Sequence, residues 1–114
     1  MDENVAGALS YLFGFLTGIV FYVVEDDNEF VRFHAAQSTL TFGGIFALSI
    51  LLGFIPLFLD SIPVVGWMVG LLFGLASLLL APVGLILWVV LLIKAYKGEM
   101  FKLPIVGEMA ENYV

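Results

Sequence analysis

The chain lacks cysteine and has few charged residues. Its 114 residues include no cysteine, and only 12% of them are charged. Without cysteine, a disulfide, a thiolate metal site and a cysteine nucleophile are all excluded. Basic residues are also scarce, with four Lys and Arg against ten Asp and Glu and a net charge of −6. This balance argues against a nucleic-acid partner, which needs a basic face, and against attachment to anionic lipid through a polybasic segment.

Long apolar runs take the place of charge, because 62% of the residues are hydrophobic. A helix that spans a bilayer needs about 20 mostly apolar residues. Three stretches qualify, at residues 6–24, 30–55 and 63–93. Helices are the expected structure, since a backbone within lipid must satisfy its own hydrogen bonds. The sequence therefore predicts an all-α membrane protein, one domain over residues 1–114 with three transmembrane helices, and the lipid bilayer as its first partner.

Prolines and the charged end set the expected boundaries. Pro56 disfavours helix at Ile55, so the second span is predicted to end there. Pro82 removes the backbone hydrogen bond to Leu78 and predicts a kink in the third helix. Residues 94–114 are too charged to span, and their apolar side chains favour a segment that lies along the cytoplasmic interface.

The four cations predict the orientation. Arg32 lies in the first loop, and Lys94, Lys97 and Lys102 lie in the C-terminal segment. With three spans these two regions share a side, which the positive-inside rule places in the cytoplasm. We therefore expect a multi-pass protein of the prokaryotic plasma membrane, with its N-terminus outside and its C-terminus cytoplasmic.

Small residues recur at intervals of four in the first and third apolar runs. Gly14 and Gly18 lie in the first, and Gly66, Gly70 and Gly74 lie in the third. Such spacing lets helix backbones approach closely in a membrane. It predicts helix-packing faces, used either within one chain or in a homo-oligomer or a complex with other membrane proteins.

Polar side chains gather at the start of the second run. His34, Gln37, Ser38 and Thr41 are spaced i, i+3, i+4 and i+7 and share one helix face, whereas Arg32 points elsewhere. Four interpretations stay open for this polar stripe. It locks the bundle by hydrogen bonds, docks a partner membrane protein, lines a vestibule for a transported species, or takes part in catalysis or metal binding.

Catalysis or metal binding is the weakest of these four interpretations. A metal usually wants three or four ligands, and this chain has a single histidine. A histidine-based nucleophilic site needs a positioned serine or cysteine with an orienting acid, and no nucleophile-elbow pattern accompanies Ser38. No phosphate- or dinucleotide-binding glycine motif is present. We expect no catalytic residue, no metal, no cofactor and no enzymatic activity.

Several blocks of the sequence resemble a known family. They are Asn28, residues 30–38 (FVRFHAAQS), residues 94–99 (KAYKGE) and residues 103–107 (LPIVG). These blocks resemble small uncharacterised prokaryotic integral membrane proteins that are similar to the Tic-twenty component of the chloroplast protein import machinery. The resemblance implies a membrane protein that works with itself or with partners, although the chloroplast relatives have four spans. The predicted function is a subunit of a membrane assembly, with protein translocation or insertion as the implied role. The alternative is an oligomeric pore or transporter for a small solute or ion.

Overall fold

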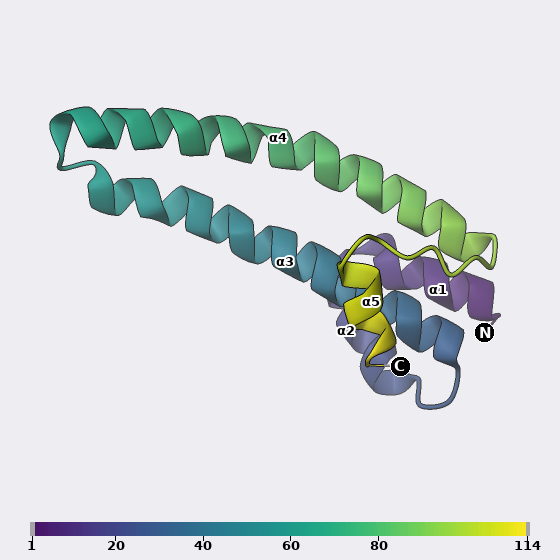
Figure 1. Ribbon diagram of the computed structural model, residues 1–114. Coiled ribbons are helices and arrows are strands. Elements are labelled where there is room, and N and C mark those ends of the chain that lie inside the picture. The colour runs from purple at the N-terminus through teal and green to yellow at the C-terminus, as the bar shows by residue number, and fades with distance from the viewer. Residues whose placement is uncertain (1, 114) are drawn as a thin grey trace.

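Two long antiparallel helices form the body of the protein, and three shorter helices cover one end of it (Figure 1). The computed structural model describes residues 2–113, which extend over 55 × 22 × 21 Å. The helices are α1 (Glu3–Leu12), α2 (Phe15–Val24), α3 (Glu29–Leu59), α4 (Pro63–Tyr96) and α5 (Val106–Glu111). The predicted all-helical class is confirmed for these residues.

The first apolar run is a pair of short helices. Gly14, between α1 and α2, has a φ of 61°, a conformation that glycine adopts without the steric penalty of a side chain. The Thr17 hydroxyl accepts from the Phe13 N–H at 3.2 Å and donates to the Ser10 carbonyl at 3.1 Å, which satisfies part of the broken backbone. The prediction of one continuous helix over residues 6–24 is therefore wrong.

The chain reverses direction at Gly14. Near the start of α1, the Asn28 side chain donates to Glu3 at 2.8 Å, and further along α1 Tyr11 contacts His34. Residues of α2 meet α3 in the opposite order. The site of a Gly18 Cβ lies 3.0 Å from the Ala35 carbonyl, and Arg32 donates to the Tyr22 carbonyl at 3.0 Å. The α1–α2 pair thus runs along α3 and back to the end from which it started.

Both ends of the chain consequently lie at one end of the molecule, together with the α2–α3 loop (Figure 1). The Asn4 side chain lies 3.1 Å from the position that a Cβ on Gly98 would occupy. We call this the network end, and the opposite end, at Asp60 and Ser61, the turn end. The predicted placement of the two termini on opposite sides needs an odd number of spans and does not fit this arrangement.

The helix α3 begins as predicted and ends later than predicted. The Asn28 side chain caps it by accepting from the Val31 N–H at 3.1 Å. The helix then continues through Pro56 to Leu59, so the predicted end at Ile55 is wrong. Proline removes one hydrogen bond, whereas leaving the helix within an apolar surrounding leaves several backbone groups without partners.

Among residues 2–113, α3 and α4 are the helices that are long and apolar enough to cross a membrane. They have 31 and 34 residues, which correspond to about 46 and 51 Å of ideal helix. A bilayer with its headgroup regions measures about 40–45 Å. The helix α2 is apolar as well, but its 10 residues are too few for a span.

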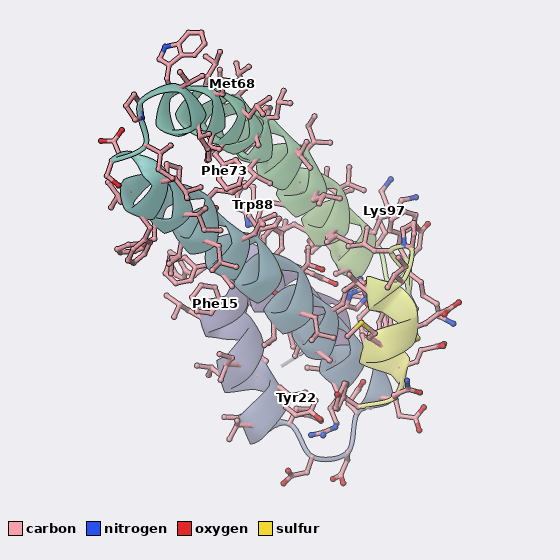
Figure 2. The ribbon with its side chains drawn as sticks, turned by 60° about the vertical axis from the view of Figure 1, so that its left-hand side comes forward. Phe15, Tyr22, Met68, Phe73, Trp88 and Lys97 are labelled. Atoms are coloured by element: carbon pink, nitrogen blue, oxygen red, sulfur yellow. The ribbon has the colours of Figure 1, made fainter. Side chains whose placement is uncertain are left out.

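The buried core lies at the network end. Tyr11, Leu91, Ala95 and Leu103 form its main cluster, which brings together α1, α4 and the segment that follows α4. Towards the turn end, large apolar side chains are exposed instead. Trp67 is 69% exposed and Phe58 is 79% exposed. Figure 2 shows side chains such as Met68 projecting outward there, where the two long helices have no third helix beside them.

The segment between α4 and α5 contains a strained residue. Ile105 has a φ of 68°, and the Val106 N–H donates across it to the Pro104 carbonyl at 2.7 Å. This tight turn around a positive φ is rare, and it is unfavourable for a β-branched residue.

Ile105→Gly is expected to raise the free energy of unfolding by about 1 kcal/mol, because the strain of a non-glycine residue at positive φ is about 1–3 kcal/mol. The Ile105 side chain is 75% exposed, so little packing is lost. Denaturant unfolding in detergent measures the change, with Ile105→Val as the control that keeps the β-branch. A glycine variant no more stable than the valine variant would contradict the strain.

Candidate functional site

The polar stripe of α3 is buried at the network end. His34, Gln37 and Ser38 are fully buried, and Thr41 is nearly so. The helix α1 covers them on one side and the segment after α4 covers them on another, so the stripe faces protein. The spacing that placed these residues on one face of a helix is confirmed, and Arg32 lies apart from them as expected.

His34 links α1 to the C-terminal segment. Its Nε2 lies 2.9 Å from the Glu99 carbonyl oxygen, and its Nδ1 lies 2.7 Å from the Tyr11 hydroxyl oxygen. A carbonyl only accepts, so Nε2 carries the proton and Tyr11 donates to Nδ1. The hydrogen-bond pattern therefore assigns a neutral imidazole with both nitrogens bonded. Three aromatic rings surround it edge-on, those of Tyr11, Phe30 and Phe33.

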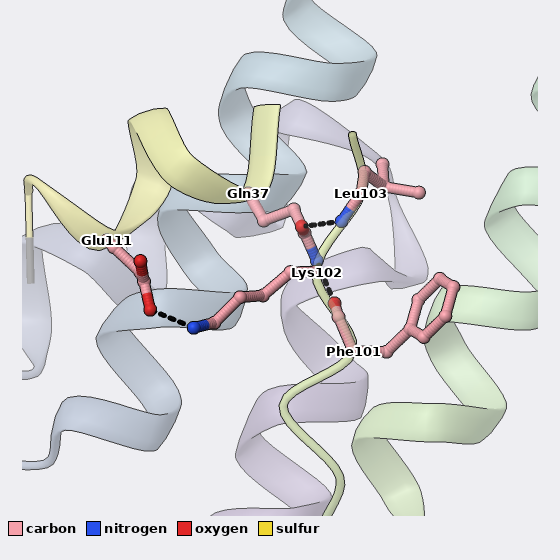
Figure 3. A network of polar contacts seen from close by, with 5 residues as sticks. All are labelled: Gln37, Phe101, Lys102, Leu103 and Glu111. Atoms are coloured by element: carbon pink, nitrogen blue, oxygen red, sulfur yellow. Dashed lines mark hydrogen bonds and ion pairs between the residues drawn. The ribbon is translucent and has the colours of Figure 1, made fainter. Parts of the chain in front are cut away.

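Gln37 uses both ends of its amide (Figure 3). Its Nε2 donates to the Tyr11 hydroxyl and to the Phe101 carbonyl, each at 2.9 Å. Its Oε1 accepts from the Leu103 N–H at 2.9 Å. Tyr11 thus donates to His34 and accepts from Gln37, and the Trp88 indole donates to the Tyr11 carbonyl at 2.6 Å.

His34 and Gln37, supported by Tyr11, hydrogen-bond the main chain of the segment after α4. The bonded groups belong to Glu99, Phe101 and Leu103, which alternate along an extended stretch. We call Tyr11, His34 and Gln37 the slot, and residues 98–105 the strap. The slot holds the strap by backbone groups, a kind of contact that does not depend on the strap's side chains.

The remaining stripe residues have separate roles. The Ser38 hydroxyl donates to the Gly14 carbonyl at 2.9 Å and so supports the turn between α1 and α2. Within residues 2–113, the Thr41 hydroxyl oxygen is buried without a hydrogen-bond partner. Arg32 donates to the carbonyls of Tyr22 and Glu25 and lies 4.3 Å from the Tyr22 ring centre, which fastens the end of α2.

The predicted glycine faces differ in what they meet. Gly18 packs closely against α3, and Gly14 lies near Phe42. Gly66 lies against the backbone of Leu59 and Asp60, where the two long helices join. At Gly70 and Gly74, by contrast, no described atom other than the neighbouring backbone of α4 lies within 4 Å of where a Cβ would be.

Sequence reasoning missed the partners of the stripe. Tyr11 and Trp88 were not singled out, although a buried Tyr or Trp commonly needs a partner for its O–H or N–H. The backbone groups of the strap carry no sequence signal at all. His34 bonds a neighbouring helix and the C-terminal segment, and whether the stripe serves as a structural lock stays a prediction.

The described residues offer little for other chemistry. No group of three or more His, Asp and Glu side chains within residues 2–113 is placed to hold a metal ion. Two of the grooves formed by residues 2–113 are lined mainly by apolar residues. One, of about 190 Å³, lies beside α2 and includes Ile19 and Leu40. The other, of about 390 Å³, lies between α3, α4 and the strap and includes Leu48 and Leu87.

Comparison with known proteins identifies similar chains. The family model described as the magnetosome magnetite crystal formation protein family matches residues 2–110. A UPF0132 membrane protein of Methanocaldococcus jannaschii is 50% identical over 99% of this chain and 89% of its own length. A UPF0132 membrane protein of Archaeoglobus fulgidus is 47% identical over 100% of this chain and 97% of its own length. No solved structure matches.

These relatives confirm the predicted resemblance to small uncharacterised prokaryotic membrane proteins. None of them is a Tic-twenty component, so that part of the predicted resemblance has no support.

Proposed function

This chain belongs to the magnetosome magnetite crystal formation protein family, and we propose that it is a structural, non-enzymatic subunit of a membrane assembly. In this proposal α3 and α4 span the bilayer, and the α1–α2 pair, the strap and α5 stiffen their network end. The observation that carries the proposal is a set of glycines on the long helices with nothing packed against them.

Four glycines of α3 and α4 have no described atom within 4 Å of a Cβ position apart from the neighbouring backbone of their own helix, namely Gly44, Gly53, Gly70 and Gly74. Glycine within a helix is less favourable than alanine by about 1 kcal/mol. Contact with lipid alone offers no compensation, whereas small residues allow close approach of another helix in a membrane. The open glycines therefore support partner helices from a second copy or from other membrane proteins.

Gly70→Leu is expected to weaken the assembly while leaving the fold of the single chain unchanged. A leucine there blocks approach of a partner helix, and its Cβ meets no described atom within 4 Å beyond the neighbouring backbone of α4. The oligomer profile in mild detergent and the unfolding midpoint measure the two effects. Leu79→Phe, on the opposite face of α4, is the control for added bulk. An unchanged oligomer profile for Gly70→Leu would count against the proposal.

The proposed topology has two spans with both termini in the cytoplasm of the prokaryotic cell. All four cations lie on residues that the fold brings to the network end, and the turn end carries only the charge of Asp60. The positive-inside rule then places the network end in the cytoplasm. This replaces the orientation expected for three spans.

A reporter that fluoresces only in the cytoplasm is expected to give signal when fused to either terminus, and none when inserted at Ser61 in the turn end. The same fusions with a reporter active only outside the cytoplasm give the reciprocal test. If the C-terminal fusion fluoresces and the N-terminal fusion does not, the two-span topology is wrong and three spans are favoured.

Protein translocation or insertion is one form that such an assembly takes in this proposal. Mild crosslinking in native membranes, followed by identification of the attached proteins, tests it. No specific observation supports the alternative of an oligomeric pore. The buried polar groups of the slot bond one another, and the two grooves described above are lined mainly by apolar residues.

A further inference from the structure

The strap is covalently attached to one long helix, α4, and its backbone is hydrogen-bonded by the other, α3. It leaves the end of α4, yet the side chains that hydrogen-bond its backbone, His34 and Gln37, come from α3. The helix α5 that follows it also packs on α3, with Ala110 in one buried cluster with Phe33 and Ala36. Lys97 connects α4 to the strap, whose first residue is Gly98. The hydrogen-bonding partners of the strap backbone thus lie on α3, whereas α4 holds its tether and packs against the Leu103 side chain.

Recognition of the strap needs little from its side chains. The slot contacts the carbonyls of Glu99 and Phe101 and the N–H of Leu103. Met100, Phe101 and Lys102 are exposed, and Leu103 is the strap residue whose side chain enters the core, beside Leu91 and Ala95. The slot is therefore a binding site for an extended polypeptide followed by one apolar side chain.

The direction of the strap depends on Gly98. This residue has a φ of 82°, and the Glu99 N–H closes the end of α4 by donating to the Lys94 carbonyl at 3.0 Å. A residue with a side chain is strained at this φ. If Gly98 adopts an ordinary negative φ, the chain leaves α4 in another direction and the strap no longer meets the slot of its own molecule.

We propose that, in the assembly, the slot of each copy binds the strap and α5 of a second copy. This rests on the proposed role as a subunit, but it uses residues other than the open glycines. The second copy is the natural occupant because residues 99–111 are a polypeptide whose fit to the slot is seen directly. Exchange reproduces every contact of the slot and changes only the hinge, which is why swapping an identical element is a low-cost route to dimers.

The absence of cysteine allows a clean test in the full-length protein. One differently tagged copy carries Ala36→Cys and the other carries Ala110→Cys, and both are expressed together in membranes. A short thiol crosslinker is expected to join the two tags, because only exchange places position 110 of one molecule beside position 36 of another. Ala36→Cys paired with Ser61→Cys, at the turn end, is the control for random collision.

Joining of the two tags at no more than the control level, while a chain carrying both Ala36→Cys and Ala110→Cys crosslinks internally, would overturn the exchange. Gly98→Ala adds a second measure. The left-handed conformation costs a side-chain-bearing residue about 1–2 kcal/mol, so this variant is expected to raise the ratio of intermolecular to internal crosslinks by about 5- to 30-fold. An unchanged ratio would overturn the role of the hinge.

Failure of the exchange is distinguishable from failure of the proposed function. If Gly70→Leu disrupts the oligomer but no intermolecular crosslink joins positions 36 and 110, the subunit role stands and each strap occupies its own slot. If Gly70→Leu changes nothing while the crosslink forms, the copies associate through the strap and the role of the open glycines fails.

Discussion

Gln37→Leu is expected to lower the free energy of unfolding by about 3 kcal/mol. Leucine has a similar size, so the change removes the amide and leaves the shape nearly intact. It leaves the Phe101 carbonyl and the buried Leu103 N–H without the partner that they have now. Each buried polar group left unpaired costs about 1–3 kcal/mol. Denaturant unfolding of the detergent-solubilised protein measures the loss, and hydrogen exchange at Leu103 is expected to accelerate with it.

Two comparisons make this result interpretable. His34→Ala removes the bonds to Tyr11 and Glu99 and is expected to cost about 1 kcal/mol, in line with polar contacts inside membranes. Thr39→Ala is the control, because the Thr39 hydroxyl bonds only the carbonyl of Ala35 on its own helix. If Gln37→Leu matches Thr39→Ala in stability, the slot does not hold the strap. Lost association with unchanged stability would instead favour partner docking by the stripe.

Gly18→Leu is expected to separate α2 from α3 and to lower the free energy of unfolding by about 3 kcal/mol, the upper part of the range for overpacked cores. Even a Cβ at Gly18 would lie 2.9 Å from the Thr39 hydroxyl and 3.0 Å from the Ala35 carbonyl. The carbonyl belongs to the backbone of α3 and has no freedom to turn aside. Unfolding in detergent reports the stability, and loosening of α2 is expected to expose the amides of α2 to hydrogen exchange.

Gly44→Leu is the matched control for Gly18→Leu. It makes the same change where a Cβ meets no described atom within 4 Å beyond the neighbouring backbone of α3, so its effect on a detergent-isolated single chain is expected to stay within about 0.5 kcal/mol. Equal losses from the two variants would contradict the close approach of α2 and α3. The pair also separates contacts within one chain from contacts between chains, since Gly44 is one of the open glycines.

The sequence predicted those parts of the fold that follow from periodicity and length. The two long apolar helices and the shared helix face of the stripe residues are local patterns that run length and a 3.6-residue repeat expose. The reversal at Gly14 was missed because residues 6–24 contain no proline and no charged residue, and Ser10 and Thr17 are too few to mark a turn. Hydropathy does not distinguish one helix of 19 residues from two that fold back, and the decisive contacts come from Ser38 on α3.

The sequence predicted some residues of the candidate site and missed others. The stripe residues of α3 were found because polar side chains are conspicuous in an apolar chain. Their partners were not, since Tyr11 looks like an interfacial aromatic and the strap contributes backbone groups that every residue possesses. Whether Gly70 and Gly74 pack within the chain was likewise beyond the sequence, because spacing alone does not tell which neighbour a glycine face meets.

The turn at Gly14 also constrains the order in which the helices can enter a bilayer. Each helix of the α1–α2 pair is 10 residues long, or about 15 Å, which reaches only halfway through a hydrocarbon core of about 30 Å. Irregular backbone at that depth is tolerated only against protein, and here Ser38 supplies the hydroxyl that bonds the Gly14 carbonyl. The first residues to be synthesised therefore depend on a later helix for their place in the bilayer. In the proposed two-span topology we therefore expect the α3–α4 hairpin to insert first, and the N-terminal pair to enter lipid once α3 is in place.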